Sequence, residues 1–383
     1  MKIKVNRQAL FEKLNHVTRA LPVKTTLPIL TGIKFVANEQ GLFLTGSDSD
    51  ITIKTHLPLL KEEQTIVEIV TPGAIVIPGK YFFEIIRKLE TDTIEVNAFD
   101  GDEVLIRGNK GEYTLKGLPA DHYPQIDLAD VLHQFNLPTN QLKMVVSQTI
   151  FAVAVNESRP TLTGVNFKMN HKELHCTATD SFRLSRRIIK SESLTDVNDF
   201  NITIPGRSLS ELGKTLDVGA ESTRVKITHN QILFENGDLS FQSRLLEGVY
   251  PDVASFIPTS FEIKVTLDYK ELFNAVDRVS LMAKEDRANV AKIKLVPDDH
   301  NVIIKSNSSE IGKIEEEIKM IALEGSKLNI ACSSLFLLDS LKAFQSNKTE
   351  VLLGFNGDMK PFVVQDKNDE ANLQLIVPVK LDE

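Results

Sequence analysis

The sequence predicts an α+β protein of three similar domains, each made of two repeated half-units of antiparallel sheet plus one helix. Three observations lead to this prediction. Long segments of the chain recur at a fixed spacing, and shorter segments recur within each of them. The stretches between the expected helices alternate apolar and polar residues and are bounded by turn residues.

The long repeat is carried by motifs that return in the same order. They are LPILTGIKF (27–35) with RPTLTGVNF (159–167), VIPGKYFFEIIRKL (76–89) with TIPGRSLSELGKTL (203–216) and more faintly NIACSSLFLLDSLK (329–342), and LPADHYPQ (118–125) with LLEGVYPDV (245–253). Pro28 and Pro160 lie 132 residues apart, whereas Pro78 and Pro205 lie 127 apart, as do Pro124 and Pro251, so the units are similar in length. The expected domains are therefore residues 1–128, 129–258 and 259–383.

Within each unit the pattern doubles, because ALFEKL near the N-terminus resembles FFEIIRKL later in the same unit. Each half-unit is expected to begin with a short strand that leads into a helix, and apolar spacing gives that helix one buried face, as with Leu10, Leu14 and Val17. The expected helices are residues 7–19, 80–88, 140–153, 207–216, 268–284 and 333–342.

Antiparallel strands are expected after each helix, as in TIEVNAF and EVLIRG, where apolar and polar residues alternate. Glycine, Asn and Asp stand where hairpins need positive φ, at Asn38–Gly41, Phe99–Asp102 and Glu235–Asp238. Hairpin connections imply antiparallel sheets.

Composition limits the class of protein. The chain has 44 Lys plus Arg against 52 Asp plus Glu and a net charge of −8, so it does not coat nucleic acid with its whole surface. Its two cysteines are too few for a disulfide framework and fit a reducing compartment. The opening MKIKVNRQALFEKL has neither a signal peptide nor an anchor, so we expect a cytoplasmic protein without a membrane partner.

Several short motifs resemble catalytic or metal-binding motifs, but their residues do not have the spacing that those functions require. Gly213-Lys214-Thr215 lacks the glycine that a phosphate loop needs at Ser208, and a helix C-terminus is expected there instead. His171 and His175 lack the glutamate position of a zinc protease and suit an exposed hairpin. Asp298-Asp299-His300 suits a turn with too few ligands for calcium, and neither cysteine is expected to act as a nucleophile. We expect no catalytic residues, metal or cofactor.

Charge differs between the expected helices and the rest of the chain. The helices sum to +6, which leaves −14 for the sheets and loops. A concave surface lined by these helices would attract a phosphate backbone while the outer surface repels it. The alternative is that helices hold more Lys and Arg because of helix propensity.

The motifs TATDSFRLS (177–185), LPILTG, VIPGK, LPADHYP and the terminal VPVKL together resemble the bacterial DNA polymerase III beta subunit family, the sliding clamps. The resemblance spans the whole chain. It implies a head-to-tail homodimer whose domains close a ring around duplex DNA, independent of DNA sequence, with helices lining a central pore and sheets outside. The implied role is processivity in DNA replication, without a catalytic site of its own.

The expected DNA contacts combine the basic helix residues with Lys24 and Asn156, which the resemblance adds. The full set is Arg7, Lys13, Arg19, Lys24, Lys80, Arg87, Lys88, Lys143, Asn156, Arg207 and Lys214.

The resemblance further implies an apolar cleft for short motifs of the replicative polymerase, the clamp loader and other proteins with clamp-binding motifs. The matching positions are Leu162, Thr179, Ser181, Phe182, Arg183, Leu184, Pro251, Phe256, Met359, Pro361, Ile376, Val377, Pro378, Val379 and Lys380. Read without the resemblance, Leu162, Leu184 and Val377 suit an ordinary core.

For the dimer, opposite charges on the first and third domains are expected to steer an edge-to-edge pairing, with one apolar anchor on a helix. These residues are Arg107, Lys110, Lys116, Leu281, Glu310, Glu315, Glu316 and Glu317.

Two features depart from the family pattern. Phe182 stands where the family usually has a polar ring, and Asp382 and Glu383 extend the usual terminal segment near Lys380. The alternative function, from a different class, is a repeat-built cytoplasmic enzyme with an unrecognised site.

Overall fold

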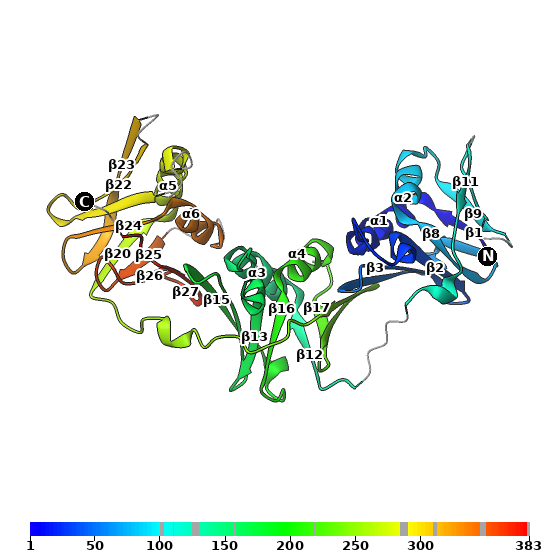
Figure 1. The fold of residues 1–383 in the computed structure, drawn as a ribbon, viewed down its shortest axis with the longest axis horizontal. Helices are drawn as coiled ribbons and strands as arrows, with labels where there is room; N and C mark the ends of the chain where they lie inside the picture. Colours follow the sequence, from blue (N-terminus) through cyan, green and yellow to red (C-terminus); the bar gives the residue numbers. More distant parts are fainter. Residues whose placement is uncertain are drawn as a thin grey trace. The chain divides into compact units, whose positions relative to one another are not determined.

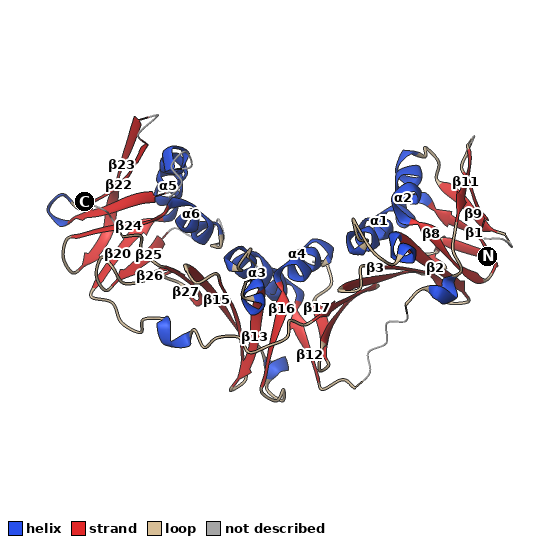
Figure 2. Ribbon diagram, in the orientation of Figure 1, coloured by secondary structure: helices blue, strands red, loops and turns tan. Residues whose placement is uncertain are grey.

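The computed structural model describes residues 1–99, 103–109, 111–124, 130–156, 158–217, 219–283, 290–308, 312–344 and 350–380 (Figure 1). The chain forms two compact units. Unit 1 comprises Met1–Asn140 with Glu211–Leu245, and unit 2 comprises Gln141–Ser210 with Leu246–Glu383. Strands and helices are mixed throughout both units, as expected for an α+β protein (Figure 2).

All six expected helices are present among the described residues. They are α1 (Arg7–Val17), α2 (Gly79–Lys88), α3 (Thr139–Thr149), α4 (Gly206–Thr215), α5 (Tyr269–Ala283) and α6 (Ser334–Lys342). Residue 284, the expected end of the fifth helix, lies outside the described residues. In α1 the Asn6 side chain accepts a hydrogen bond from the Ala9 amide at 3.0 Å, which caps the helix. Leu10, Leu14 and Val17 are buried, as their spacing predicts.

Unit 1 holds one five-stranded sheet, one eight-stranded sheet and a small two-stranded sheet. The five-stranded sheet has the order β11 (Glu112–Lys116), β10 (Glu103–Arg107), β9 (Thr93–Ala98), β1 (Lys2–Asn6), β7 (Val67–Thr71). The eight-stranded sheet has the order β12 (His133–Pro138), β17 (Ser222–Ile227), β18 (Gln231–Asn236), β19 (Leu239–Arg244), β4 (Ile51–Leu57), β3 (Gly41–Ser47), β2 (Gly32–Asn38), β8 (Gly73–Pro78). The third pairs β5 (Leu60–Lys61) with β6 (Gln64–Thr65).

Unit 2 holds one twelve-stranded sheet. Its order is β16 (Phe200–Pro205), β13 (Gly164–Asn170), β14 (Glu173–Thr179), β15 (Arg183–Lys190), β27 (Asp369–Ile376), β26 (Phe362–Asp366), β25 (Glu350–Phe355), β20 (Ile263–Asp268), β23 (Gly312–Glu324), β22 (Asn301–Ser308), β21 (Val290–Val296), β24 (Leu328–Ser333).

The large sheets are built from two kinds of four-stranded group, and β7 adds a fifth strand to the smallest of them. One kind of group is β1-β9-β10-β11, β12-β17-β18-β19 and β20-β25-β26-β27, and the other is β8-β2-β3-β4, β16-β13-β14-β15 and β24-β21-β22-β23. Registers repeat too. Thr45 on β3 pairs with Lys34 and Lys54, and Thr177 on β14, 132 residues later, pairs with Asn166 and Arg186. This confirms the repeat within a repeat.

Neighbouring repeats are joined through two antiparallel seams. In the first seam β4 pairs with β19 from Ile51–Ser243 to Thr55–Leu239, and in the second β15 pairs with β27 from Arg183–Ile376 to Arg187–Asn372. The first seam lies within unit 1 and the second within unit 2.

Helices pack on one face of the sheets in each unit (Figure 2). In unit 1, α1 packs on β3 and β4 and touches α2, where Phe11 and Phe83 stack with ring centroids 5.4 Å apart. In unit 2, α5 packs on β22 and β23 and against α6 over a fully buried core that includes Val276, Ile304 and Leu341. Burial of the apolar faces of these helices holds the helix layer against the sheet.

The expected turns occur where the residues are described. Gly41 and Gly237 have φ of 131° and 58° in the β2–β3 and β18–β19 turns. Residues 100–102 of the third turn lie outside the described residues. His171, with a φ of 49°, lies in the β13–β14 hairpin, and Gly213-Lys214-Thr215 forms the end of α4, as expected.

Candidate functional site

Unit 2 has an apolar cavity of about 470 Å³ along the second seam. It is lined by Arg159, Leu162, Thr179, Ser181, Arg183, Leu184, Pro251, Val253, Phe256, Pro361, Leu375 and Val377. Leu184 and Leu375 pair directly across the β15–β27 seam and form its floor. Both belong to a small buried apolar cluster, against which Val253 and Val377 pack. The cavity is the open side of that cluster.

A tight turn between β14 and β15 forms one wall of the cavity. The Thr179 hydroxyl donates to the Arg183 carbonyl at 2.6 Å, and the Asp180 carboxylate accepts from the Phe182 and Arg183 amides at 2.9 and 3.0 Å. Ser181 has a φ of 79°. Because side chains of Thr and Asp satisfy the turn amides, the sequence TDSFR sets this geometry locally.

Arg183 is the fixed charge of the cavity. Its guanidinium donates to Asp180 at 3.0 Å and to Asp339 on α6 at 2.9 Å. Its guanidinium carbon lies 5.3 Å from the Phe151 ring centroid and 4.5 Å from that of Phe336. Two carboxylates and two aromatic rings therefore hold this side chain and neutralise it.

Large apolar side chains are exposed near this cavity. Phe182, Phe256 and Met359 are 62%, 66% and 55% exposed. Exposed aromatic and Met side chains beside an apolar hollow are typical of a surface that binds a partner.

Nine of the fifteen residues expected in the cleft line this cavity. They are Leu162, Thr179, Ser181, Arg183, Leu184, Pro251, Phe256, Pro361 and Val377. Phe182, Met359, Pro378, Val379 and Lys380 do not line it, and Ile376 is fully buried in the core. Arg159, Val253 and Leu375 line it and were missed. The sequence could have indicated Leu375, because neighbouring residues of a strand point to opposite faces, so Leu375 and Ile376 cannot both face the core.

The terminal segment is tied to both sides of the second seam. The Val377 amide donates to the Phe182 carbonyl at 2.9 Å, and the Val379 amide donates to the Ala331 carbonyl at 2.8 Å. Asp382 and Glu383 lie outside the described residues.

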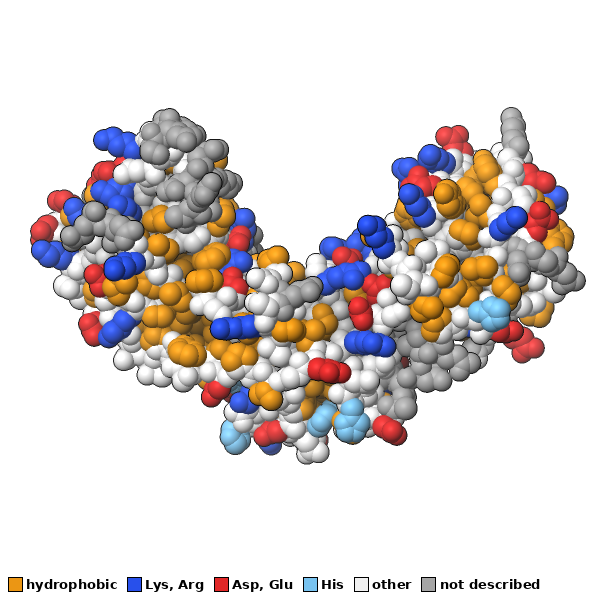
Figure 3. Space-filling view, viewed as in Figure 1, with side chains coloured by type: hydrophobic (Ala, Val, Ile, Leu, Met, Phe, Trp, Pro, Cys, Tyr) orange, Lys and Arg blue, Asp and Glu red, His pale blue; other side chains and the backbone are white. Residues whose placement is uncertain are grey.

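Basic side chains gather over α1 and α2 in unit 1 (Figure 3). Several of these cations have partners within the unit. Lys13 lies 3.5 Å from Asp238, Arg19 lies 3.3 Å from Glu211, and Lys214 lies 2.7 Å from the same glutamate. These pairs are partly exposed, so each contributes little to stability, and each carboxylate offsets part of the positive charge of its cation.

The α2 cations share one carboxylate. Glu84 lies 2.7 Å from Arg87 and 3.9 Å from Lys88, and the hydrogen bond from Arg87 lowers the pKa of Glu84. Arg7 contacts the Ile86 carbonyl at 3.4 Å, which links α1 to α2. Among the described residues, no ion pair involves Lys24 or Lys80.

The other expected DNA contacts belong to unit 2. Lys143 lies on α3, Arg207 lies on α4, and Asn156 lies in the loop after α3, where its side chain accepts from the Ser158 amide at 3.0 Å.

The residues expected at the dimer interface lie near two strand edges. Arg107 on β10 lies 2.8 Å from Glu112, and Lys116 is exposed on β11, the last strand of its sheet. Leu281 on α5 is 61% exposed. Lys110 and Glu310 lie outside the described residues.

The glutamates of β23 have partners inside the chain. Arg278 donates to Glu316 at 2.7 and 2.8 Å, Asn301 donates to Glu317, and Glu315 lies 4.0 Å from Lys305. The charge available for steering is therefore smaller than the glutamate run suggests.

No cluster of His, Cys, Asp and Glu within the described residues could hold a metal ion. Both cysteines are buried, and burial raises the pKa of Cys332 to about 12 and that of Cys176 higher still. Among the helices that the structure describes, none is long and apolar enough to span a membrane.

Comparison with known proteins covers the whole chain. Models of the DNA polymerase III beta subunit match residues 1–127 (N-terminal domain), 136–252 (central domain) and 254–380 (C-terminal domain). The beta sliding clamp of Bacillus subtilis is 42% identical over 380 residues, covering 99% of this chain and 100% of that protein. The beta sliding clamp of Staphylococcus aureus is 40% identical, with 99% of each chain covered.

Solved structures agree with the sequence comparisons. The DNA polymerase sliding clamp of Bacillus subtilis superimposes with a TM-score of 0.94 over 100% of both chains, at 42% identity. The beta subunit of the Streptococcus pyogenes DNA polymerase gives a TM-score of 0.92 over 100% of both chains, at 32% identity.

Proposed function

This chain belongs to the DNA polymerase III beta subunit family, the sliding clamps, and on this premise we propose that two copies close head to tail into a ring around duplex DNA. The ring tethers the replicative polymerase during synthesis and contributes no catalytic group of its own. Nothing in the comparisons favours the alternative of a repeat-built enzyme. We place the protein in the cytoplasm, with residues 1–128, 129–258 and 259–383 as its three domains.

Closure of the ring is supported by the pattern of seams. Each seam joins the outer strand of one kind of four-stranded group to the outer strand of the other kind in the next repeat. Three repeats make two such seams and leave over β11, the last strand of its sheet, in the first repeat and residues 312–319 of β23 in the third. Among the described residues, this first part of β23 pairs with β22 alone, while Met320–Glu324 of the same strand pairs with β20. Pairing these strands between copies removes two exposed edges. Because the joined surfaces differ, the contact is heterologous, and the proposed ring requires that the rotation between the two copies close.

The register of that intermolecular seam follows from the two seams inside the chain. Transferring the β4–β19 pairing brings Tyr113 on β11 opposite Ile314 on β23. Tyr113 is 40% exposed in the single chain, and Ile314 is partly buried. An aromatic residue opposite a β-branched one is a favourable cross-strand pair. Leu281 adds apolar surface on α5.

DNA contact rests on charge. The helices sum to +6 in a chain of net charge −8, and basic side chains gather over α1 and α2 (Figure 3). A few phosphate contacts with Lys and Arg suffice for a protein linked topologically to DNA, because sliding requires weak contacts without base readout.

The cavity on the second seam receives short apolar peptide motifs of the polymerase, of a clamp loader and of other proteins that use the clamp. Its apolar floor, its neutralised arginine and the exposed Phe256 beside it suit a peptide groove.

Retention on DNA tests the central claim. After loading onto a nicked circular plasmid, the protein should remain bound through gel filtration at about 0.5 M salt, where surface charges are strongly screened, and should be lost once the plasmid is cut. Equal retention on circular and linear DNA would show direct binding instead of encirclement.

A further inference from the structure

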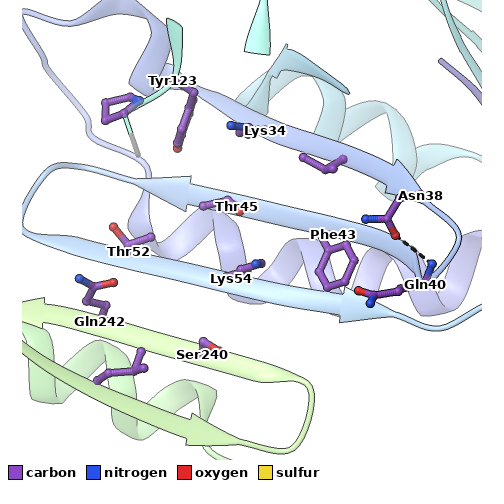
Figure 4. Close-up of a pocket in the computed structure, with 13 residues that line it drawn as sticks. Lys34, Asn38, Gln40, Phe43, Thr45, Thr52, Lys54, Tyr123, Ser240 and Gln242 are labelled. Atoms are coloured by element: carbon purple, nitrogen blue, oxygen red, sulfur yellow. Dashed lines mark hydrogen bonds between the residues drawn. The ribbon is translucent and has the colours of Figure 1, made fainter. Parts of the chain in front are cut away.

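Unit 1 has a second hollow, of about 630 Å³, on its first seam (Figure 4). It lies on the face of the eight-stranded sheet that is turned away from the helices, and its lining comes from β2, β3, β4, β18 and β19 together with Tyr123 and Pro124. We propose that this hollow binds an acidic peptide segment of a partner protein, in addition to the apolar cleft of unit 2.

One pair of residues in the hollow, Thr52 and Gln242, occupies the seam position that corresponds to the floor of the apolar cleft. Leu184 pairs with Leu375 across the second seam, and Thr52, which is 132 residues before Leu184, pairs with Gln242 across the first. The same backbone arrangement therefore presents two leucines in one unit and two hydrogen-bonding side chains in the other. A partner with apolar anchors suits only the first arrangement, and a polar partner suits only the second.

Positive charge runs across this hollow along one row of paired residues. Lys34, Thr45, Lys54 and Ser240 follow each other on β2, β3, β4 and β19 (Figure 4). Among the described residues, none that lines the hollow is acidic, and no ion pair involves either lysine. The next residue of the row, Glu235, is already paired with Lys226 at 3.0 Å.

Both ammonium groups lie against aromatic rings. Lys34 Nζ lies 5.9 Å from the Tyr123 ring centroid, and Lys54 Nζ lies 5.0 Å from that of Phe43. A cation–π contact orients a lysine without neutralising its charge. Asn38, Gln40 and Gln242 add amide groups that can donate to a backbone carbonyl or a carboxylate.

The aromatic rings disfavour a nucleic-acid strand as the occupant. Tyr123 is only 2% exposed, and the Phe43 ring is stacked on His56 at 4.5 Å with Lys54 beside it. Among the described residues that line the hollow, neither aromatic ring offers an open face for base stacking, on which single-strand binding depends.

The distance between the two lysines indicates how the acidic residues of the peptide are spaced. Lys34 and Lys54 are two strands apart, which separates their Cα atoms by about 10 Å. In an extended peptide of polyproline II type, residues i and i+3 point to the same side about 9 Å apart. A segment with acidic residues at i and i+3, lying across the strands, places one carboxylate at each lysine.

The test uses the full chain and a labelled dodecapeptide that has two Asp residues at i and i+3 among Gly, Ser and Leu. Its binding is measured by fluorescence anisotropy, beside the same peptide with Asn in place of Asp. We expect the Asp peptide to bind about tenfold more tightly, which is about 1.4 kcal/mol of binding free energy, because each of its two Asp residues replaces a neutral hydrogen bond of the Asn peptide with a charge-assisted one. The variant Lys34→Glu/Lys54→Glu should lose at least this tenfold preference, and Lys34→Arg/Lys54→Arg should keep it.

Two controls make the result decisive. Lys168→Glu, on the corresponding face of unit 2, should bind the Asp peptide as the unchanged chain does, and thermal melting should be alike for all variants. The proposal would be overturned if the Asp and Asn peptides bound equally, or if Lys34→Glu/Lys54→Glu bound the Asp peptide as the unchanged chain does. It would also be overturned if Lys168→Glu lost binding, or if a dodecathymidine displaced the peptide.

Discussion

Arg183 on β15 and Asp339 on α6 are joined by a hydrogen-bonded ion pair of 2.9 Å, so one residue of the apolar cleft also fastens a helix of the third repeat. The contact is partly buried and is reinforced by Phe336 beneath the guanidinium. The proposed peptide binding and the joint between repeats therefore share one side chain.

Asp339→Asn should reduce stability by about 1 to 2 kcal/mol, because the charge-assisted hydrogen bond becomes a weaker neutral one. Arg183→Ala should cost more, since Asp180 and Asp339 both lose their cation. Urea unfolding curves would show whether Arg183→Ala is less stable than Asp339→Asn. An unchanged midpoint for Arg183→Ala would mean that the ion pairs contribute nothing net.

In the proposed cleft, Met359→Ala and deletion of residues 379–383 should weaken binding of a polymerase-derived peptide and leave the ring folded. The deletion removes the Val379–Ala331 hydrogen bond but keeps Val377 in the cavity lining. Calorimetry measures the peptide affinity and thermal melting measures the stability, so the two measurements together separate a loss of binding from a loss of folding. If the variants melt early but bind the peptide with normal affinity, the terminal segment is structural.

For the dimer, Tyr113→Glu should yield monomers at low micromolar concentration, because it places an unpaired charge at a contact that becomes buried. Leu281→Asp should act in the same direction. Tyr81→Glu is the matched control, since Tyr81 is 65% exposed on α2, away from both edges. Sedimentation velocity would decide, and dimeric Tyr113→Glu would place the interface elsewhere.

For DNA contact, Arg19→Glu/Lys24→Glu should reduce processivity and lower the slope of log affinity against log salt by about 2, because each substituted cation no longer neutralises one phosphate. Lys61→Glu/Lys168→Glu makes the same change in net charge on sheets and serves as control. If both double variants lose processivity equally, the effect comes from the net charge of the protein and not from these two positions.

Stability should fall as the pH drops below about 6.5. Burial, with Lys13 and Arg19 nearby, lowers the pKa of His16 below its ordinary value of 6.5, and burial with Arg186 nearby lowers that of His175. The unfolded chain then binds more protons than the folded chain below pH 6.5, so these groups favour folding above that pH and lose that contribution as the pH falls through their folded pKa values.

His16→Gln/His175→Gln should therefore flatten the change in urea midpoint between pH 7.5 and 5.5, chosen to bracket the unfolded histidine pKa of about 6.5. His300→Gln, in an exposed turn, should leave the change as it is. An equal pH dependence in the double variant would assign the effect to carboxylates.

The helices and the repeat were predictable because their signals are local or periodic, as with the buried spacing of Leu10, Leu14 and Val17. The cleft was predictable only in part. The family resemblance supplied Ile376 as a matching position, but neighbouring residues of a strand point to opposite faces, so Leu375 lines the cavity and Ile376 lies in the core.

Ion pairs between distant parts of the chain were not predictable either. Arg19 and Glu211 lie far apart in sequence and 3.3 Å apart in space. A charge sum over helices counts both residues but cannot show that they meet, so it does not show which cations have a carboxylate partner.

The two strands left over after the internal seams, β11 and β23, bear on how the proposed ring opens. Inside each chain a seam is backed by a continuous polypeptide, so separating it also stretches the connecting segments. At a junction between copies no covalent link crosses. The proposed ring would therefore have two equivalent junctions. Breaking the backbone hydrogen bonds of one junction would suffice to admit a double helix, while the other junction would act as the hinge.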